Sequence, residues 1–269
     1  MDEIILCKYG EIVLKGLNKK QFETVMLKQI RHRIEPFGRF SVTSAQSIAY
    51  IKPESCEGDF EEDADIESAF NAVRKVFGIV TVAKAAVTEK NMDAVFSAVT
   101  EYILPELRRR EYKTFKVEGK RGDKTFALTS PEISSETGAL ILKNAPWLRV
   151  NVKNPDVVVR VEIRAVNAYV YIDSVKGAGG LPVGSGGRGL LLLSGGIDSP
   201  VAGWMMAKRG VAVDALHFES FPYTSERARQ KVIALAQKMT EYCGDIRLHI
   251  LSVTQIQETL KRSCEEDYF

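Results

Sequence analysis

The sequence predicts a multidomain chain in which α+β units are followed by an α/β unit. Three observations support this fold class. Residues 1–175 mix strand and helix patterns without regular alternation, a glycine-rich segment follows at 176–189, and strands alternate with helices from residue 190. Regular alternation is typical of a parallel sheet. At 269 residues, with 45% hydrophobic and 27% charged residues, the chain is long enough for two or three domains with separate cores.

The first unit, at 1–60, is expected to be a small α+β domain. The runs EIILCKY and EIVLKG have the short apolar pattern of strands. Behind Asn18, a residue type common at helix starts, apolar residues recur with helical spacing. The run 39–52 then predicts a return strand.

The second unit, at 61–175, is expected to be a larger α+β domain. Two helical patterns surround the alternating run IVTVAKAAV, and the second of them is expected to end at Pro105. The remaining pattern predicts a strand, a helix and further strands in turn, at 113–121, 134–145 and 156–173.

Charge is unevenly distributed over these two units. The run 54–67 carries eight acidic residues and no basic one, whereas 105–165 carries thirteen Lys or Arg against eight Asp or Glu. Because clustered cations attract polyanions, the basic region is a candidate nucleic-acid surface. The alternatives are an ordinary solvated basic surface and, for 108–110, cations that stabilise the end of a helix.

The cysteines and apolar runs bear on the cellular compartment. The four cysteines are Cys7, Cys56, Cys243 and Cys264. They form no C-x-x-C pair, which argues against a disulfide framework or zinc site and favours a reducing, cytoplasmic compartment. The first residues lack the pattern of a signal peptide, and no apolar run approaches the ~20 residues of a membrane span. We therefore expect no membrane partner.

The glycine-rich segment 176–189 holds seven glycines and one proline. It predicts either a flexible linker or an ordered loop beside an active site, and both place a domain boundary there. The third unit, at 190–269, is expected to be part of a doubly wound parallel sheet with ligands at the carboxyl ends of its strands. Its first strand, 190–193, is expected to be buried. Only three strand–helix pairs follow, so we expect this domain to be incomplete.

The leucine run leads directly into the stretch SGGIDS, from Ser194 to Ser199, and then into a helical pattern. A helix N-terminus binds anions through its unpaired N–H groups, and glycines let a phosphate approach the backbone closely. Asp198 is unusual there, because a carboxylate repels phosphate unless it neutralises the helix end, holds a metal ion or shapes the loop. Neither G-x-x-x-x-G-K-[ST] nor G-x-G-x-x-G follows the strand, which argues against a Walker A loop and a dinucleotide fold.

SGGIDS, with a strand before it and a helix after it, resembles the pyrophosphate loop (PP-loop) of ATP pyrophosphatases that adenylate a carbonyl oxygen. The wider chain resembles the tRNA 4-thiouridine synthetase (tRNA sulfurtransferase) family. The stretches that carry this resemblance are KYGEIVLKG, VKNPDVVVRVEI, KGAGGLPVGS and HFESFPYTSERARQKV. The resemblance implies a ferredoxin-like first domain, a THUMP RNA-binding second domain and a partial PP-loop third domain.

The resemblance also implies a reaction. Such a protein would use ATP, with Mg²⁺ implied, to adenylate the C4 oxygen of the uridine at the eighth nucleotide of tRNA. A persulfide delivered by a cysteine desulfurase would then displace AMP. Sulfur supply for the thiazole of thiamine is a second family role, and a homodimer is a reasonable expectation. Cys243 and Cys264 are poor substitutes for the family's sulfur-handling cysteines, which lie beyond the position of Phe269.

Site residues are expected as follows. Asp198 is expected to be needed for adenylation. The expected ATP contacts are Leu192, Leu193, Ser194, Gly195, Gly196, Ser199, His217 and Phe218. The expected tRNA phosphate contacts lie in or beside strands of the basic domain and are Lys116, Lys120, Arg121 and Lys153. No residues are assigned to a protein-only metal site, and His217 is as well explained by a structural role at a strand end.

Two other functions remain open. One is a non-catalytic tRNA-binding protein with an incomplete nucleotide domain. The other is a different PP-loop ligase, such as a tRNA lysidine synthetase or a GMP synthetase. The basic middle domain argues against GMP synthetase, where an amidotransferase would be expected to supply ammonia.

Overall fold

A computed structural model describes residues 2–54 and 64–264. The chain forms two compact units, each assembled from separate stretches of sequence. Unit 1 comprises 1–8, 33–74 and 81–176, and unit 2 comprises 9–32, 75–80 and 177–269. Most of the acidic run 54–67, together with Cys56, lies outside the described residues.

Unit 1 is built on a nine-stranded sheet with the order β2-β3-β1-β4-β8-β7-β5-β6, in which β9 pairs with β4. The strands are β1 (Glu3–Tyr9), β2 (Phe40–Ala45), β3 (Ile48–Pro53), β4 (Ile79–Glu89), β5 (Thr114–Arg121), β6 (Arg149–Val150), β7 (Val157–Ile163), β8 (Asn167–Ile172) and β9 (Val175–Lys176). Strand β5 pairs in parallel with β7 and β6, whereas β7 and β8 form an antiparallel hairpin. The strands predicted between 79 and 173 are confirmed.

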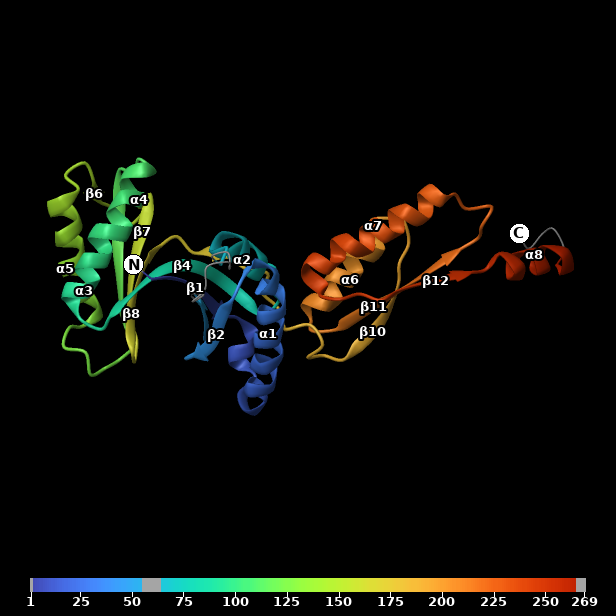
Figure 1. Cartoon of the computed structure of the whole chain (residues 1–269), viewed down its shortest axis with the longest axis horizontal. Helices are drawn as coiled ribbons and strands as arrows, with labels where there is room; N and C mark the ends of the chain where they lie inside the picture. Colours follow the sequence, from blue (N-terminus) through green and yellow to red (C-terminus); the bar gives the residue numbers. More distant parts are fainter. Residues whose placement is uncertain (1, 55–63, 265–269) are drawn as a thin grey trace, which may run out of the picture. The chain divides into compact units, whose positions relative to one another are not determined.

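Helices cover one face of the β5-β7-β8 part of this sheet (Figure 1). They are α3 (Met92–Ala98), a π-helical turn (Val99–Ile103), α4 (Leu104–Arg109) and α5 (Ser130–Asn144). Their buried apolar side chains join those of the strands in one core, as Ile103, Ile133 and Val159 illustrate. Helix α2 (Ile66–Val73) is capped by Asp65, whose carboxylate accepts a hydrogen bond from the Ser68 N–H at 2.9 Å.

The prediction that a helix ends at Pro105 is wrong. Helical structure continues through Pro105 to Arg109, because the π-helical turn Val99–Ile103 interrupts the regular hydrogen-bond ladder just before it. Pro105 then lies in the first turn of α4, where a missing N–H is tolerated.

The predicted strand EIVLKG is also wrong. Glu11–Leu14 and Gly16–Asn18 form short 3-10 helices, followed at once by α1 (Lys19–Ile34) and a 3-10 turn at Glu35–Phe37. Only Ile12 of the first helix is buried, and Leu14 is 85% exposed. A short apolar run without a partner strand has no ladder of backbone hydrogen bonds to stabilise it.

The run 39–52 forms two strands instead of the single strand predicted. Strands β2 and β3 pair antiparallel around Gln46 and Ser47, whose φ angles are 51° and 63°. Two left-handed residues make the tight turn that suits a hairpin. Neither residue is a glycine or asparagine, so the sequence lacks the usual signal for this turn.

Unit 2 contains a second sheet, with the order β10-β11-β12 and parallel pairing throughout. Its elements are β10 (Arg188–Leu192), α6 (Asp198–Lys208), β11 (Ala212–Glu219), α7 (Glu226–Cys243), β12 (Leu248–Ser252) and α8 (Thr254–Ser263). This alternation confirms the predicted α/β pattern. Helices α6 and α7 pack in one core with Val213, Ala215 and Leu193. Across 2–54 and 64–264, no helix has the length and apolarity needed to cross a bilayer.

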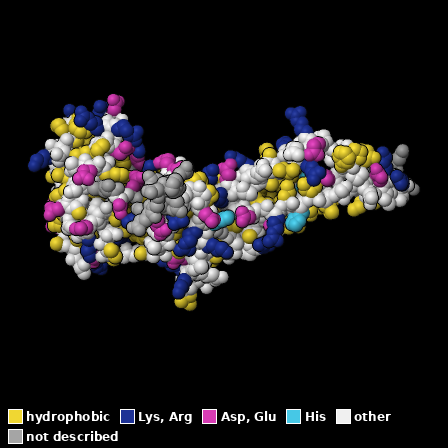
Figure 2. All heavy atoms as spheres, viewed as in Figure 1, with side chains coloured by type: hydrophobic (Ala, Val, Ile, Leu, Met, Phe, Trp, Pro, Cys, Tyr) yellow, Lys and Arg dark blue, Asp and Glu magenta, His cyan; other side chains and the backbone are white. Residues whose placement is uncertain are grey.

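The first strand of this sheet is not buried as predicted. Leu193 is 2% exposed, but Leu190 and Leu192 are 59% and 61% exposed. Successive side chains of a strand alternate between faces, and α6 and α7 cover only one face. Figure 2 shows further hydrophobic side chains exposed over the part of the chain that carries these helices.

The glycine-rich segment is ordered, so the flexible-linker alternative is wrong. Leu181 N–H donates to the Lys208 carbonyl at 2.9 Å, and Gly186 N–H donates to the Gly210 carbonyl at 2.8 Å. These bonds fix the segment at the carboxyl end of α6. The loop SGGIDS precedes the opposite end of that helix, so the segment does not border it.

Candidate functional site

The loop SGGIDS leaves the carboxyl end of β10 and enters α6, as its sequence predicts. Its two serines hold it in shape. Ser194 N–H donates to Ser199 Oγ at 3.0 Å, the two hydroxyl oxygens lie 3.2 Å apart, and Gly196 N–H donates to Ser194 Oγ at 3.3 Å. The loop is therefore folded back on the start of the helix, beside the neighbouring parallel strand β11.

The fold does not itself require glycine at 195 or 196. Neither residue has a left-handed φ, and a Cβ atom at Gly195 or Gly196 would meet its nearest neighbour at 3.6 or 3.5 Å. In contrast, a Cβ at Gly203 would lie 2.5 Å from Met239 Cε. The two loop glycines thus leave free room over the backbone, which is what a closely approaching phosphate needs.

Asp198 is the first residue of α6, and its side chain is exposed. Its position suits the positive end of the helix dipole. Its carboxylate has no hydrogen bond or ion pair with the rest of the described chain. Mg²⁺ is often held by one or two carboxylates together with substrate phosphates, so a single carboxylate beside a phosphate loop fits that ion. Within 2–54 and 64–264, no cluster of three or more His, Cys, Asp or Glu could hold a metal alone.

The other predicted ATP contacts lie at the ends of the two adjacent strands. Leu193 N–H donates to the Leu216 carbonyl at 2.8 Å, and His217 Nδ1 lies 3.0 Å from the Leu193 carbonyl oxygen. The imidazole of His217 therefore links the end of β11 to the residue before the loop. Phe218 is 45% exposed. The structure brings all the predicted ATP residues together at one edge of the sheet.

Two features of this edge were missed from the sequence. The side chain of Lys231, on α7, passes the loop, with Cδ 3.6 Å from the position of a Cβ on Gly195. A pocket of about 440 Å³ opens at the carboxyl ends of β11 and β12 and is lined by Glu219, Phe221, Thr224, Ser225, Glu226, Arg229 and Ser252. Most of these residues belong to the stretch HFESFPYTSERARQKV, which offered the signal.

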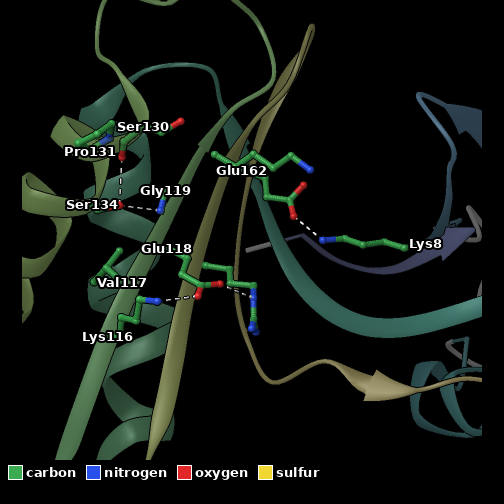
Figure 3. A pocket seen from close by; sticks show the side chains of 11 residues that line it. Lys8, Lys116, Val117, Glu118, Gly119, Ser130, Pro131, Ser134 and Glu162 are labelled. Carbon is green, nitrogen blue, oxygen red and sulfur yellow. Dashed lines mark hydrogen bonds and ion pairs between the residues drawn. The ribbon is translucent and has the colours of Figure 1, made fainter. Parts of the chain in front are cut away.

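Unit 1 carries a basic pocket of about 580 Å³ (Figure 3). It is lined by Lys8, Lys116, Val117, Glu118, Gly119, Lys120, Ser130, Pro131, Ser134, Arg160 and Glu162. Four cations thus face two carboxylates. Two of the predicted RNA contacts, Lys116 and Lys120, line this pocket from β5. Lys8 and Arg160 were missed. For Arg160 a signal was present, because charged residues stand at alternate positions of the apolar strand VVVRVEI.

The amino end of α5 forms one wall of this pocket. Gly119 is needed there, because a Cβ would lie 2.6 Å from the Ser130 carbonyl oxygen. Ser134 Oγ accepts a hydrogen bond from Gly119 N–H at 2.7 Å, as Figure 3 shows. The helix start is further fixed by Glu132, whose carboxylate accepts from Thr129 N–H at 2.7 Å. A helix N-terminus beside several cations is a favourable place for an anion.

A buried ion-pair network closes the pocket. Lys8 Nζ lies 2.5 Å from Glu162 Oε1 (Figure 3). The same oxygen accepts a hydrogen bond from the Tyr171 hydroxyl at 2.7 Å. Arg164 binds the second carboxylate oxygen. Burial alone raises the pKa of the Glu162 carboxyl, but the hydrogen bonds and charges of these neighbours outweigh burial and lower this pKa to about 2. Glu162 is therefore ionised at neutral pH.

The remaining predicted RNA contacts do not line this pocket. Arg121 donates from its guanidinium to the Phe126 carbonyl at 3.3 Å, and Lys153 is exposed in the loop after β6. Arg109 and Arg110 both pair with Glu106 near the end of α4. This arrangement supports the alternative that the run 108–110 stabilises a helix end.

The parallel sheet and its serine- and glycine-rich loop define a PP-loop protein. Three consecutive family descriptions match the chain: the ThiI ferredoxin-like domain at 4–83, the THUMP domain at 89–173, and the thiamine biosynthesis protein (ThiI) at 184–269. The chain belongs to the ThiI family. The ferredoxin-like, THUMP and PP-loop architecture expected from the sequence is confirmed.

Curated relatives agree with this family. Proteins named probable tRNA sulfurtransferase from Acetivibrio thermocellus and Alkaliphilus metalliredigens are 44% and 45% identical over 267 residues. Each alignment covers 99% of this chain and 66% of the relative, so the chain spans slightly less than two thirds of the relatives' length.

Two solved structures share the fold over nearly the whole chain. The crystal structure of a 4-thiouridine synthetase–RNA complex with bound ATP matches with a TM-score of 0.86 and 36% identity, over 100% of this chain and 66% of that one. The structure of PH1313 from Pyrococcus horikoshii matches with a TM-score of 0.79 and 25% identity, over 97% of this chain and 82% of that one.

Proposed function

We propose that this chain provides the tRNA-holding and ATP-activating parts of a cytoplasmic, ATP-dependent tRNA sulfurtransferase that makes 4-thiouridine at the eighth nucleotide of tRNA. The observation that carries the proposal is the loop SGGIDS, with free room over Gly195 and Gly196 and an unpaired Asp198. The names of the curated relatives and the RNA and ATP in a similar solved structure support it.

In this proposal ATP binds at the carboxyl ends of strands β10 and β11 of the second sheet. Backbone N–H groups of Gly195 and Gly196 and the hydroxyls of Ser194 and Ser199 hold the phosphates. Backbone groups of Leu192, Leu193, His217 and Phe218 bind the adenosine part, because main-chain groups can recognise a base edge without a special side chain.

Asp198 supports transfer of adenylate to the C4 oxygen of uridine. With Mg²⁺ present, its carboxylate would hold the ion against the phosphates, and the ion would supply charge neutralisation there. At the start of α6 the negative carboxylate also interacts favourably with the positive end of the helix dipole.

The basic pocket of unit 1 holds tRNA phosphates. Lys116 and Lys120 act there with Lys8 and Arg160, at the amino end of α5. Arg121 and Lys153 bind tRNA phosphates outside the pocket. Lys153 lies in an exposed loop, and Arg121 is the last residue of β5. Contacts of this kind position the RNA without reading its sequence.

The sulfur comes from a partner. The terminal sulfur of a persulfide carried by a cysteine desulfurase would attack C4 and displace AMP, and a second thiol would then cleave the S–S bond, which leaves 4-thiouridine and a disulfide. Cys7 and Cys243 are buried, and burial raises the pKa of the Cys7 thiol, so neither suits this step. Cys264 is exposed at the end of α8 but has no neighbouring cysteine in the described chain. A homodimer and sulfur supply for thiamine synthesis are further parts of the proposal.

One experiment tests adenylation directly. The chain is incubated with tRNA and α-labelled ATP, and pyrophosphate release and label on the RNA are measured. We expect Asp198→Asn to lower the rate at least ~100-fold, the scale of losing one electrostatic group from a catalytic site. The matched control is Asp93→Asn, an exposed acid in the first turn of α3, which should leave the rate unchanged.

Tight tRNA binding without pyrophosphate release would contradict this proposal. It would favour the non-catalytic RNA-binding protein, whose tRNA affinity Asp198→Asn would leave unchanged.

A further inference from the structure

The phosphate loop contains no cation. Ser194 to Ser199 offers N–H groups, hydroxyls and one carboxylate, whereas a Walker A loop includes a lysine that reaches the phosphates. ATP brings several negative charges to this edge of the sheet, and Asp198 adds another. A positive side chain from another element is therefore needed beside the loop.

Lys231 lies where such a cation is needed. Its Cδ would stand 3.6 Å from a Cβ on Gly195, an ordinary van der Waals distance, so its aliphatic stem runs along the glycine. The ammonium is two bonds beyond that carbon. The residue is exposed, and it has no ion pair or hydrogen bond with the described part of the chain.

Other cations on α6 and α7 are less suited to this task. Arg229, two residues earlier on α7, lies 3.7 Å from the Glu219 carboxylate. Lys208 is at the far end of α6 and rests over the Trp204 ring, with Nζ 4.9 Å from the ring centroid. Lys231 has no such partner among the described residues, and its side chain passes beside the loop.

We propose that Lys231 is a phosphate-binding residue of the ATP site, and that its ammonium binds the triphosphate held on the loop SGGIDS. This inference rests on the proposed function, because it requires that ATP binds there. A lysine suits the role, since it is a compact charge with three donors on a flexible stem. The cation comes from α7 instead of the loop, so the phosphate site is completed only when α6 and α7 pack together.

Binding of ATP and of adenosine to the 269-residue chain tests this inference by isothermal titration calorimetry. Lys231→Met removes the charge and keeps the stem, and we expect it to weaken ATP binding about tenfold, the effect of one hydrogen bond to a charged group. Adenosine has no phosphate, so its affinity should not change. Lys231→Arg keeps the charge and should recover most of the ATP affinity.

Lys261→Met is the matched control, because Lys261 is an exposed lysine on α8 with no ion pair among the described residues. It should bind ATP as the wild type does. All variants should retain the wild-type melting temperature, since neither lysine belongs to the core.

Equal ATP affinity in Lys231→Met and wild type would overturn the inference and leave Asp198-dependent adenylation standing. An equal loss for ATP and adenosine would also overturn it, because the residue would then act through the fold. If the wild-type chain takes up no ATP, this inference and the proposed ATP site both fail.

Discussion

At the scale of single residues, glycine is present in this chain for two different reasons. Gly119 is required by a neighbouring backbone atom, since a Cβ there would lie 2.6 Å from the Ser130 carbonyl oxygen. Gly195 and Gly196 have room for a Cβ and no left-handed φ. The packing of the described chain does not explain glycine at those two positions, so close approach by a ligand does.

Gly195→Ala tests that distinction. We expect the melting temperature to stay the same or rise slightly, because alanine fits the backbone and restricts the unfolded chain. ATP affinity should fall about tenfold, because the new methyl group keeps a phosphate from one N–H donor. The control is Gly138→Ala on α5, where the nearest neighbour of a Cβ is at 3.8 Å; it should not affect ATP binding. Unchanged ATP affinity in Gly195→Ala would contradict the assignment of this glycine to phosphate binding.

Glu162 links strand β7 to β1 through a buried charge. Its side chain is 4% exposed and that of Arg164 is 10% exposed. We expect Glu162→Gln to lower the free energy of unfolding at pH 7 by about 3 kcal/mol, because two cations would face a neutral amide. Urea denaturation measures this loss. Glu136→Gln, an exposed acid on α5, should change stability by less than about 0.5 kcal/mol.

The contribution of Glu162 should depend on pH in a defined direction. Its pKa in the folded chain is about 2, below the ordinary value of 4.5. The ionised carboxylate therefore stabilises the fold above the unfolded-state pKa, and this stabilisation is lost as pH falls through 4.5 towards about 2. The stability difference between wild type and Glu162→Gln should shrink over that range. A difference independent of pH would show that packing, not charge, is responsible.

At the scale of elements, local signals in the sequence account for most helices and strands. The T-x-x-E pattern at Thr129 marks the true start of α5, four residues before the region where periodicity alone predicted a helix. The predictions of helices and strands were wrong where the local sequence gives no signal for the backbone conformation. The Gln46–Ser47 turn uses left-handed residues that are not glycine, and the π-helical turn before Pro105 has no compositional mark.

The glycine-rich element offers a test of order against flexibility. Gly179 and Gly180 both have left-handed φ angles, 66° and 73°, but only Gly180 is crowded, with a Cβ position 2.3 Å from the Lys208 carbonyl oxygen. Gly179→Ala should cost about 1 kcal/mol from backbone strain alone. Gly180→Ala should cost clearly more, since the backbone of α6 must shift. Thermal unfolding compares the two, and negligible effects in both would mean that the segment behaves as a flexible linker.

At the scale of the whole molecule, each compact unit is built from stretches that are far apart in the sequence. Unit 2 joins 9–32 and 75–80 to the residues after 176. Gln29 Nε2 donates to the Val183 carbonyl at 2.6 Å, and Lys75 pairs with Glu241 at 2.7 Å. These partners are 154 and 166 residues apart in the chain. No local pattern in the sequence encodes such contacts.

The same limit applies to the sites. The loop SGGIDS is continuous, and its chemistry could be predicted from its residues and from the strand and helix around it. The basic pocket gathers side chains from β1, β5, β7 and α5, so Lys116 and Lys120 were found but Lys8 and Arg160 were not. Lys231 was missed for the same reason, because only the packing of α7 brings it to the loop.

The two sites lie in different units, so their ligands should be separable by substitution. Lys116→Ala and Lys120→Ala should each weaken tRNA binding and reduce its dependence on log salt concentration by roughly 0.7 to 1, because each removes one phosphate contact. ATP affinity should be unaffected. Asp198→Asn should do the reverse, lowering adenylation without changing tRNA affinity. Filter binding over a salt series measures the first effect.

Lys143→Ala is the control for this separation, since Lys143 is an exposed cation at the end of α5 outside the pocket. If it weakens tRNA binding as much as Lys116→Ala does, the RNA is held by a general basic surface. A selective effect of Lys116 and Lys120 means that the phosphates enter the pocket at the amino end of α5. There the helix dipole adds to four side-chain cations, and two carboxylates keep those cations in place.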